Sequence, residues 1–157
     1  MPIYGVDNWE PACDVYKTNN PRVRMLRMDV HEFSTQKHDW NVYTDVAHIS
    51  PPCQYFSPNH TRERGACPND DSNYAASFCV IELLKKIKPR FVTSEQTFGI
   101  LHSEFTQAFS IFISQFTDIG YSVTWRVVRF ERYGLPQRRH RLLLMAAALV
   151  SLVLDWK

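Results

Sequence analysis

The sequence predicts an α/β fold in which a mostly parallel sheet is covered by helices. Apolar runs of strand length alternate along the chain with segments in which apolar residues recur every three or four positions. The chain has 157 residues and is 45% hydrophobic, which is enough for one buried core and argues against a disordered chain. Because no repeat, low-complexity tract or linker interrupts this pattern, we expect one domain over residues 1–157.

Six apolar runs have the length of strands. In chain order they are Ile3–Val6, Met25–Met28, Val46–Ser50, Arg90–Ser94, Ser122–Val128 and Arg141–Ala147. Most are separated by segments of helical period, as expected when parallel strands are joined by crossover helices.

Three segments are expected to be helical. The first follows Pro11 and ends near Asn19, and the second spans Tyr74–Lys88 and ends before Pro89. The third and clearest spans Ser103–Asp118, with Ser103 as its cap and Gly120 at its end. The apolar faces are expected to be Phe78, Ile81, Leu84 and Ile87 in the second helix, and Phe105, Phe109, Phe112, Phe116 and Ile119 in the third.

The composition narrows the class of protein. A net charge of +2 does not by itself indicate a nucleic-acid binder, although Arg138–Arg141 form a dense basic cluster. The four cysteines form no CxxC pair, so we expect no metal site and no disulfide framework, and we interpret Cys13, Cys67 and Cys79 as ordinary thiols. We expect no secretory signal and no membrane span, because the longest apolar run, Leu142–Leu154, is shorter than the ~20 residues that a span needs.

Polar or reactive residues stand at the carboxyl ends of four predicted strands, where ligands bind in open α/β sheets. They are Asp7, Asp29, the tripeptide Pro52–Gln54 and the tripeptide Glu95–Thr97. Pro51 and Pro52 restrict the backbone just before Cys53, so its thiol is aimed with little loss of entropy. The long polar segment Tyr55–Asn73 that follows is expected to be a functional loop.

Three motifs resemble the cytosine-5 DNA methyltransferases; two lie at these strand ends, and one lies directly before the last predicted strand. "SPPCQYFS" looks like the nucleophile loop of that family, "TSEQT" like its glutamate motif, and "YGLPQRRHR" like its QxRxR motif. Their order and approximate spacing agree over about Gly5–Ala147. EQT in place of the usual ENV, and "FSPNHT" after the cysteine, are similar to a fungal branch tied to gene silencing, which favours DNA as substrate and the nucleus as location.

The resemblance implies a Rossmann-like, three-layer fold that depends on S-adenosylmethionine, with a mostly parallel sheet and an antiparallel last strand. It also implies a covalent reaction on a cytosine flipped out of double-stranded DNA. Cys53 is the expected nucleophile, Glu95 the group that shares a proton with the ring, and Arg141, supported by Arg139, the cation at the 2-oxo group. Pro52, Gln54 and Gln137 are expected to bind the substrate or organise its loop.

The resemblance places the cofactor at the ends of the first two predicted strands. Asp7 is expected to accept hydrogen bonds from the ribose, with Asn8 or Trp9 beside the adenine, and Asp29 with Val30 to contact the adenine edge.

Parts of the family pattern find no match in this sequence. They are the first strand with its glycine-rich turn, the target-recognition region, and an arginine whose place is taken by Asn73. We therefore expect either a gap in the sheet or re-pairing of the flanking strands, and a partner or complementing domain for activity.

Three alternatives remain. They are a non-catalytic remnant or interaction module of the family, an RNA cytosine-5 methyltransferase, and a thiol hydrolase. The hydrolase would need His48 or His60 near Cys53.

Overall fold

A computed structural model describes residues 3–37, 43–58 and 70–149. They belong to two compact units, Met1–Asn41 and Val42–Lys157, which are described separately below. That the chain acts as one domain stays a prediction.

The smaller unit is a pair of parallel strands with two helices. Strands β1 (Tyr4–Asp7) and β2 (Arg24–Arg27) pair in parallel, and helix α1 (Glu10–Asn19) connects them. Helix α1 was expected, and Pro11 lies in its first turn, where a missing N–H costs nothing. Helix α2 (Val30–Thr35) was not expected, and it begins where the Asp29 carboxylate accepts a hydrogen bond from the His31 N–H at 2.7 Å.

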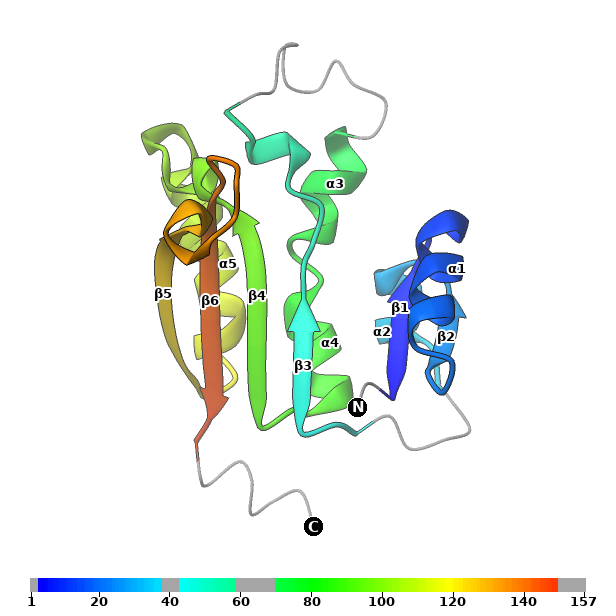
Figure 1. Cartoon of the computed structure of the whole chain (residues 1–157). Coiled ribbons are helices and arrows are strands. Elements are labelled where there is room, and N and C mark those ends of the chain that lie inside the picture. Colours follow the sequence, from blue (N-terminus) through cyan, green and yellow to red (C-terminus); the bar gives the residue numbers. More distant parts are fainter. Residues whose placement is uncertain (1–2, 38–42, 59–69, 150–157) are drawn as a thin grey trace. The chain divides into compact units, whose positions relative to one another are not determined.

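The larger unit is built on a four-stranded sheet in the order β3-β4-β6-β5 (Figure 1). The strands are β3 (Val46–Ile49), β4 (Phe91–Thr97), β5 (Tyr121–Arg129) and β6 (His140–Ala148). Strand β3 is parallel to β4, whereas β6 is antiparallel to both of its neighbours. The predicted antiparallel last strand is therefore confirmed, and all six predicted strands are present.

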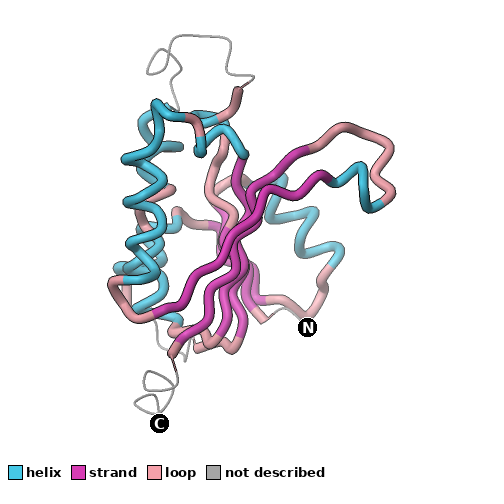
Figure 2. The backbone as a smooth tube through the Cα atoms, turned by 90° about the vertical axis from the view of Figure 1, so that its left-hand side faces the viewer, coloured by secondary structure: helices cyan, strands magenta, loops and turns pink. Residues whose placement is uncertain are grey.

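Among the described residues the strands form two separate sheets, so the flanking strands have not re-paired. In the larger unit, α4 (Val80–Ile87) and α5 (Thr106–Thr117) lie on one side of the sheet (Figure 2). On the opposite face Phe91 and Met145 are half-exposed. Within the described part of this unit two layers are present, and the three-layer arrangement of the whole fold stays a prediction.

Two apolar clusters hold the larger unit together. One joins α4 and α5 to the sheet through Val80, Leu84, Val92, Phe112, Phe116, Tyr121, Leu144 and Ala146. The other surrounds the start of α5 and the loop after β3, and contains Phe56, Ile100, Phe105, Ala108 and Leu142. The phenylalanine face predicted for the third helix thus lies in the core, with Phe109 and Ile119 at its margin.

The helix expected over Tyr74–Lys88 is broken into α3 (Asp70–Ala76) and α4. Gln115 of α5 causes the break, because its side chain accepts a hydrogen bond from the Val80 N–H at 2.9 Å and donates one to the Ser77 carbonyl at 3.0 Å. These bonds satisfy backbone groups that a continuous helix would have paired internally. The buried face accordingly shifts to Val80, Leu83, Leu84 and Ile87, and the expected burial of Phe78 and Ile81 is only partial.

The start of α5 also differs from the prediction. Ser103 does not cap the helix; Ser103–Phe105 form a short 3-10 turn (η3), and α5 begins at Thr106 without a side-chain cap. Its burial against the sheet replaces the missing cap as the source of stability. Gly120, expected at the end, adopts a positive φ of 86°, which glycine tolerates without strain.

Removing the hydroxyl of Tyr121 is expected to destabilise the larger unit by about 1 kcal/mol. This hydroxyl donates a hydrogen bond of 2.6 Å to the Pro89 carbonyl, and burial raises the pKa of Tyr121 to about 12. Because the folded state then holds its proton to higher pH than the unfolded state, this contribution is present below pH ~10 and is lost as the pH rises towards 12. Urea unfolding of Tyr121→Phe and wild type between pH 8 and 11.5 measures both effects, and an unchanged alkaline slope in the variant would contradict them.

Candidate functional site

Cys53 lies in a short loop that leaves the carboxyl end of β3. Pro51 and Pro52 precede it outside regular secondary structure, and a 3-10 turn, η1 (Gln54–Phe56), follows it. Phe56 is completely buried in the second apolar cluster and anchors the turn. The thiol is half-buried, so the loop is fixed on its core side while the sulfur remains accessible.

A second turn, η2 (Phe98–Leu101), packs directly against this loop at Gly99. A Cβ atom on Gly99 would lie 2.0 Å from the Phe56 carbonyl oxygen and 2.8 Å from the Pro58 ring. The two backbones can approach this closely only because residue 99 has no side chain. Gly99 therefore helps to set the position of the Cys53 loop.

Glu95, in the last half of β4, lies between two arginines. Its Oε1 atom is 2.7 Å from Nε of Arg141 and 3.3 Å from Nη2 of Arg139. The Arg139 contact is a hydrogen bond, whereas the Arg141 Nε lacks hydrogen-bond geometry, so that contact is an attraction of charges. The Arg141 side chain is 22% exposed and the Glu95 side chain 26%, so water weakens this pair less than a surface pair.

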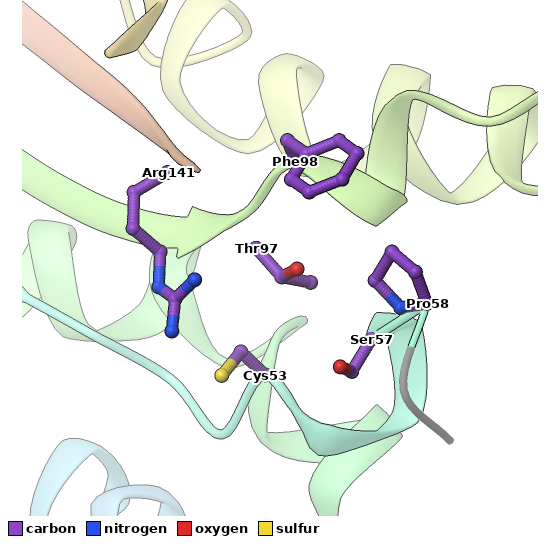
Figure 3. Close-up of a pocket in the computed structure, with 6 residues that line it drawn as sticks. All are labelled: Cys53, Ser57, Pro58, Thr97, Phe98 and Arg141. Atoms are coloured by element: carbon purple, nitrogen blue, oxygen red, sulfur yellow. The ribbon is translucent and has the colours of Figure 1, made fainter. Parts of the chain in front are cut away.

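Cys53 and Arg141 line one cavity of about 140 Å³, together with Ser57, Pro58, Thr97 and Phe98 (Figure 3). The Arg141 side chain extends from β6 towards the loop that carries Cys53. A protein cavity of about 150 Å³ can hold one six-membered ring. Glu95 does not line the cavity and reaches it only through Arg141. Two of the four expected catalytic residues, Cys53 and Arg141, therefore line the cavity. The other two do not line it: Glu95 contacts Arg141, and Arg139 contacts Glu95.

The remaining substrate residues lie around this site without lining it. Pro52 is half-buried, and Gln54 and Gln137 are exposed. Sequence reasoning missed the four other cavity residues, Ser57, Pro58, Thr97 and Phe98. All four stand within or directly beside the quoted motifs. Their nearness in sequence to Cys53 and Glu95 was the signal that could have identified them.

The cofactor residues all belong to the smaller unit, at the carboxyl ends of its strands. The Asp7 carboxylate accepts a hydrogen bond from the Trp9 N–H at 2.8 Å, and Asp29 caps α2. Both side chains and Asn8 are exposed, Val30 is half-buried, and the Trp9 ring is 65% exposed. Acceptor oxygens beside an open aromatic ring suit the ribose and adenine of a nucleoside. The donor set thus fits the nucleoside part of S-adenosylmethionine.

The described residues support neither a reactive role for another cysteine nor a thiol hydrolase built on Cys53 and a histidine. Cys13 is buried, and burial followed by the charge of Asp7 raises its pKa; Cys79 is half-buried; Cys67 lies outside the described residues. His48 contacts the hydroxyls of Ser50 and Thr93 and is not among the residues lining the cavity of Cys53. His60 and most of the expected loop Tyr55–Asn73 also lie outside the described residues.

The described ranges contain no candidate metal site and no candidate membrane span. No cluster of three potential metal ligands occurs among residues 3–37, 43–58 and 70–149. In the same ranges no helix has the length and apolar content needed to cross a bilayer.

Comparison with known proteins identifies the class to which this fold and site belong. The family described as C-5 cytosine-specific DNA methylase matches residues 1–150, and the chain is a member of that family. The antiparallel last strand agrees with the fold that the resemblance implies.

Individual relatives align with most of the chain. The type II methyltransferase M.MthTI of Methanothermobacter thermautotrophicus is 23% identical over 148 residues, covering 91% of this chain and 41% of its own length. M.BsuFI of Bacillus subtilis is 33% identical over 101 residues, or 64% of this chain and 24% of its own. The structure of S. pombe Dnmt2 methyltransferase superposes with a TM-score of 0.65 at 16% identity, covering 94% and 42% of the two chains. The chain thus spans about two fifths of the first of these relatives.

Proposed function

We propose that this chain is the nucleophile-bearing part of a catalytic domain that methylates carbon 5 of cytosine in DNA. The observation that carries the proposal is the single cavity lined by Cys53 and Arg141, with Glu95 against the Arg141 guanidinium. Membership of the cytosine-5 methylase family supports the same chemistry.

The reaction requires the cytosine ring to be activated, because carbon 5 is a poor nucleophile. In the proposed step the Cys53 thiolate bonds to carbon 6, and the ring electrons move towards nitrogen 3. For Glu95 to share a proton there, its side chain has to turn from its contact with Arg141 into the cavity, which it does not line in this structure. Carbon 5 becomes electron-rich through this attack at carbon 6 and takes up a methyl group. Loss of the carbon 5 proton to water then restores the double bond and releases the thiolate of Cys53, and the proton at nitrogen 3 returns to Glu95.

The guanidinium of Arg141 is proposed to face the 2-oxo group of the ring. Negative charge gathers on that oxygen as carbon 6 is attacked, and a fixed cation in a half-buried site stabilises it. Arg139 contacts the same Oε1 atom of Glu95 as Arg141 does. Gln137 is proposed to organise the loop, and Pro52 and Gln54 to contact the base. A cavity of one-ring size requires the base to leave the duplex before it can react.

S-adenosylmethionine, when bound, supplies an electrophilic methyl group. The residues proposed to bind its nucleoside part are Asp7, Asn8, Trp9, Asp29 and Val30. Both carboxylates keep exposed positions at strand ends and are held by short backbone hydrogen bonds.

Double-stranded DNA is the proposed partner, and the Arg138–Arg141 cluster beside the cavity gives phosphates a local positive surface. Because the chain spans about two fifths of the length of M.MthTI, a complementing domain or partner is proposed for full activity. Nuclear location and a role in gene silencing stay predictions.

Covalent trapping tests the proposal. Wild type incubated with S-adenosylmethionine and a duplex carrying 5-fluorocytosine is expected to form an adduct stable to denaturation, since fluorine at carbon 5 cannot leave as a proton. Cys53→Ala should form none, whereas Cys79→Ala, which removes a half-buried thiol outside the cavity, should match wild type. An RNA oligonucleotide of the same sequence separates the two substrates, and an adduct only with RNA would overturn DNA as the substrate.

A non-catalytic remnant is the second candidate. It is favoured by the position of Glu95, which is not among the residues that line the cavity of Cys53 and Arg141. Absence of an adduct in wild type, with the fold intact by circular dichroism, would support this candidate over catalysis.

A further inference from the structure

The turn between β5 and β6 is held by a carboxylate that the family motifs do not include. Glu131 lies in a 3-10 turn, η4 (Phe130–Tyr133), directly after β5. Its Oε1 atom is 2.9 Å from Nε2 of His140, and its Oε2 atom accepts a hydrogen bond from the Arg139 N–H at 3.4 Å. One side chain thus connects η4 to two consecutive residues at the start of β6.

Backbone hydrogen bonds reinforce the same junction. The Phe130 N–H donates to the Arg139 carbonyl at 2.9 Å, and the Leu135 N–H donates to the Phe130 carbonyl at 3.3 Å. Gly134, with a φ of 89°, turns the chain between them. The hydrogen bond from its own backbone N–H, followed by those with His140 and Arg139, lowers the pKa of Glu131, so its carboxylate is charged at neutral pH. The loop that holds Gln137 is therefore held at both ends, by the bonds that join Phe130 and Glu131 to Arg139.

Because side chains alternate along β6, the contacts of Glu131 with His140 and Arg139 also affect the candidate site. Successive residues of a strand point to opposite faces, so within β6 (His140–Ala148) His140 faces one way and Arg141 the other. On its own side His140 is bound by Glu131, and its ring lies 5.9 Å from that of Phe98, a cavity residue. On the other side Arg141 contacts Glu95, which Arg139 also contacts. Fixing His140 therefore fixes the direction in which Arg141 leaves the strand, and the bond from the Arg139 N–H to Glu131 fixes the backbone of Arg139.

We propose that Glu131 is a positioning residue that, through His140 and the Arg139 backbone, aligns Arg139 and Arg141 with Glu95 and the cavity. The inference rests on the proposed function for its catalytic consequence, but the alignment itself is a property of the fold. Glu131 touches neither Cys53 nor the cavity, so it acts only through the residues that it holds.

The kinetic test follows adduct formation with the 5-fluorocytosine duplex. Glu131→Ala is expected to slow adduct formation at saturating duplex at least tenfold, while the duplex Kd changes less than twofold, because the arginine charges remain but lose their alignment. Glu131→Gln is expected to restore the rate to within threefold of wild type, since an amide can accept from the Arg139 N–H and donate to the His140 ring. Glu82→Ala, which removes another exposed glutamate with an ion pair at 3.3 Å, is the control and should match wild type.

A second readout separates this inference from the proposed function. In NMR spectra of the chain, Glu131→Ala is expected to shift the Nε–Hε signals of Arg139 and Arg141 and the carboxyl signal of Glu95, whereas Glu131→Gln and Glu82→Ala should leave them in place. If wild type forms no adduct but these shifts occur, the proposed catalysis fails and the positioning role stands. If Glu131→Ala leaves the three signals unchanged, or slows the reaction only as much as Glu82→Ala does, the positioning role is overturned.

Discussion

Gly99→Ala is expected to destabilise the larger unit by about 3 kcal/mol, with a fall in Tm of about 10 °C or more. The added Cβ would lie 2.0 Å from the Phe56 carbonyl oxygen, a backbone atom that cannot move away by a change of rotamer. Relief requires η1 to separate from η2, which pulls the fully buried Phe56 out of its cluster. Thermal unfolding followed by circular dichroism measures the loss.

Gly134→Ala is the matched control for this substitution. Gly134 has a φ of 89° and no atom within 4 Å of an added Cβ, so the substitution carries only the backbone cost of a positive φ, about 1 kcal/mol. The Gly99→Ala variant should therefore melt well below the Gly134→Ala variant. Equal melting temperatures would show that the Cys53 loop does not pack against η2 as described.

Arg141→Lys is expected to slow covalent trapping by about 100-fold, the scale of losing a fixed donor to a developing oxyanion. Lysine keeps the positive charge, so duplex binding should change little. Its ammonium group is a single point charge, whereas the guanidinium places Nε 2.7 Å from Glu95, donates from Nη1 to the His140 carbonyl at 2.9 Å and still lines the cavity. The measurement is the rate of adduct formation at saturating 5-fluorocytosine duplex.

Arg138→Lys is the control in the same loop, because Arg138 is exposed and does not line the cavity. It should react within twofold of wild type. A rate for Arg141→Lys within threefold of wild type would remove Arg141 from the proposed role at the 2-oxo group. If neither variant nor wild type reacts, the proposed catalysis fails as a whole.

Much of the framework could be predicted from local sequence patterns. All six strands lie where apolar runs of strand length predicted them, since burial of such a run is a local property of the sequence. The order of the three motifs predicted that Cys53 and Arg141 meet, and they line one cavity. The carboxyl ends of β3 and β4 and the amino end of the antiparallel β6 lie at the same edge of the sheet, which is why motifs far apart in sequence meet there.

Contacts between distant segments decided what the patterns could not show. The break between α3 and α4 depends on Gln115, which is more than thirty positions away, and so no local pattern over Tyr74–Lys88 could reveal it. Helix α2 was missed because it is a six-residue helix, too short to show a clear period. Asp29 served as its cap, the ordinary structural role of an acid at a strand end.

The sequence by itself determined the positions of the strands and the face of α5 that is buried, because each depends on residues close together in the chain. Only the tertiary structure decided that Glu95 reaches the cavity through Arg141, that Gly99 permits the close approach of Phe56, and that Glu131 binds His140. These contacts join segments whose spacing in sequence carries no periodic signal, and they form only when the burial of Phe56, Leu142 and their neighbours brings the segments within a few ångströms.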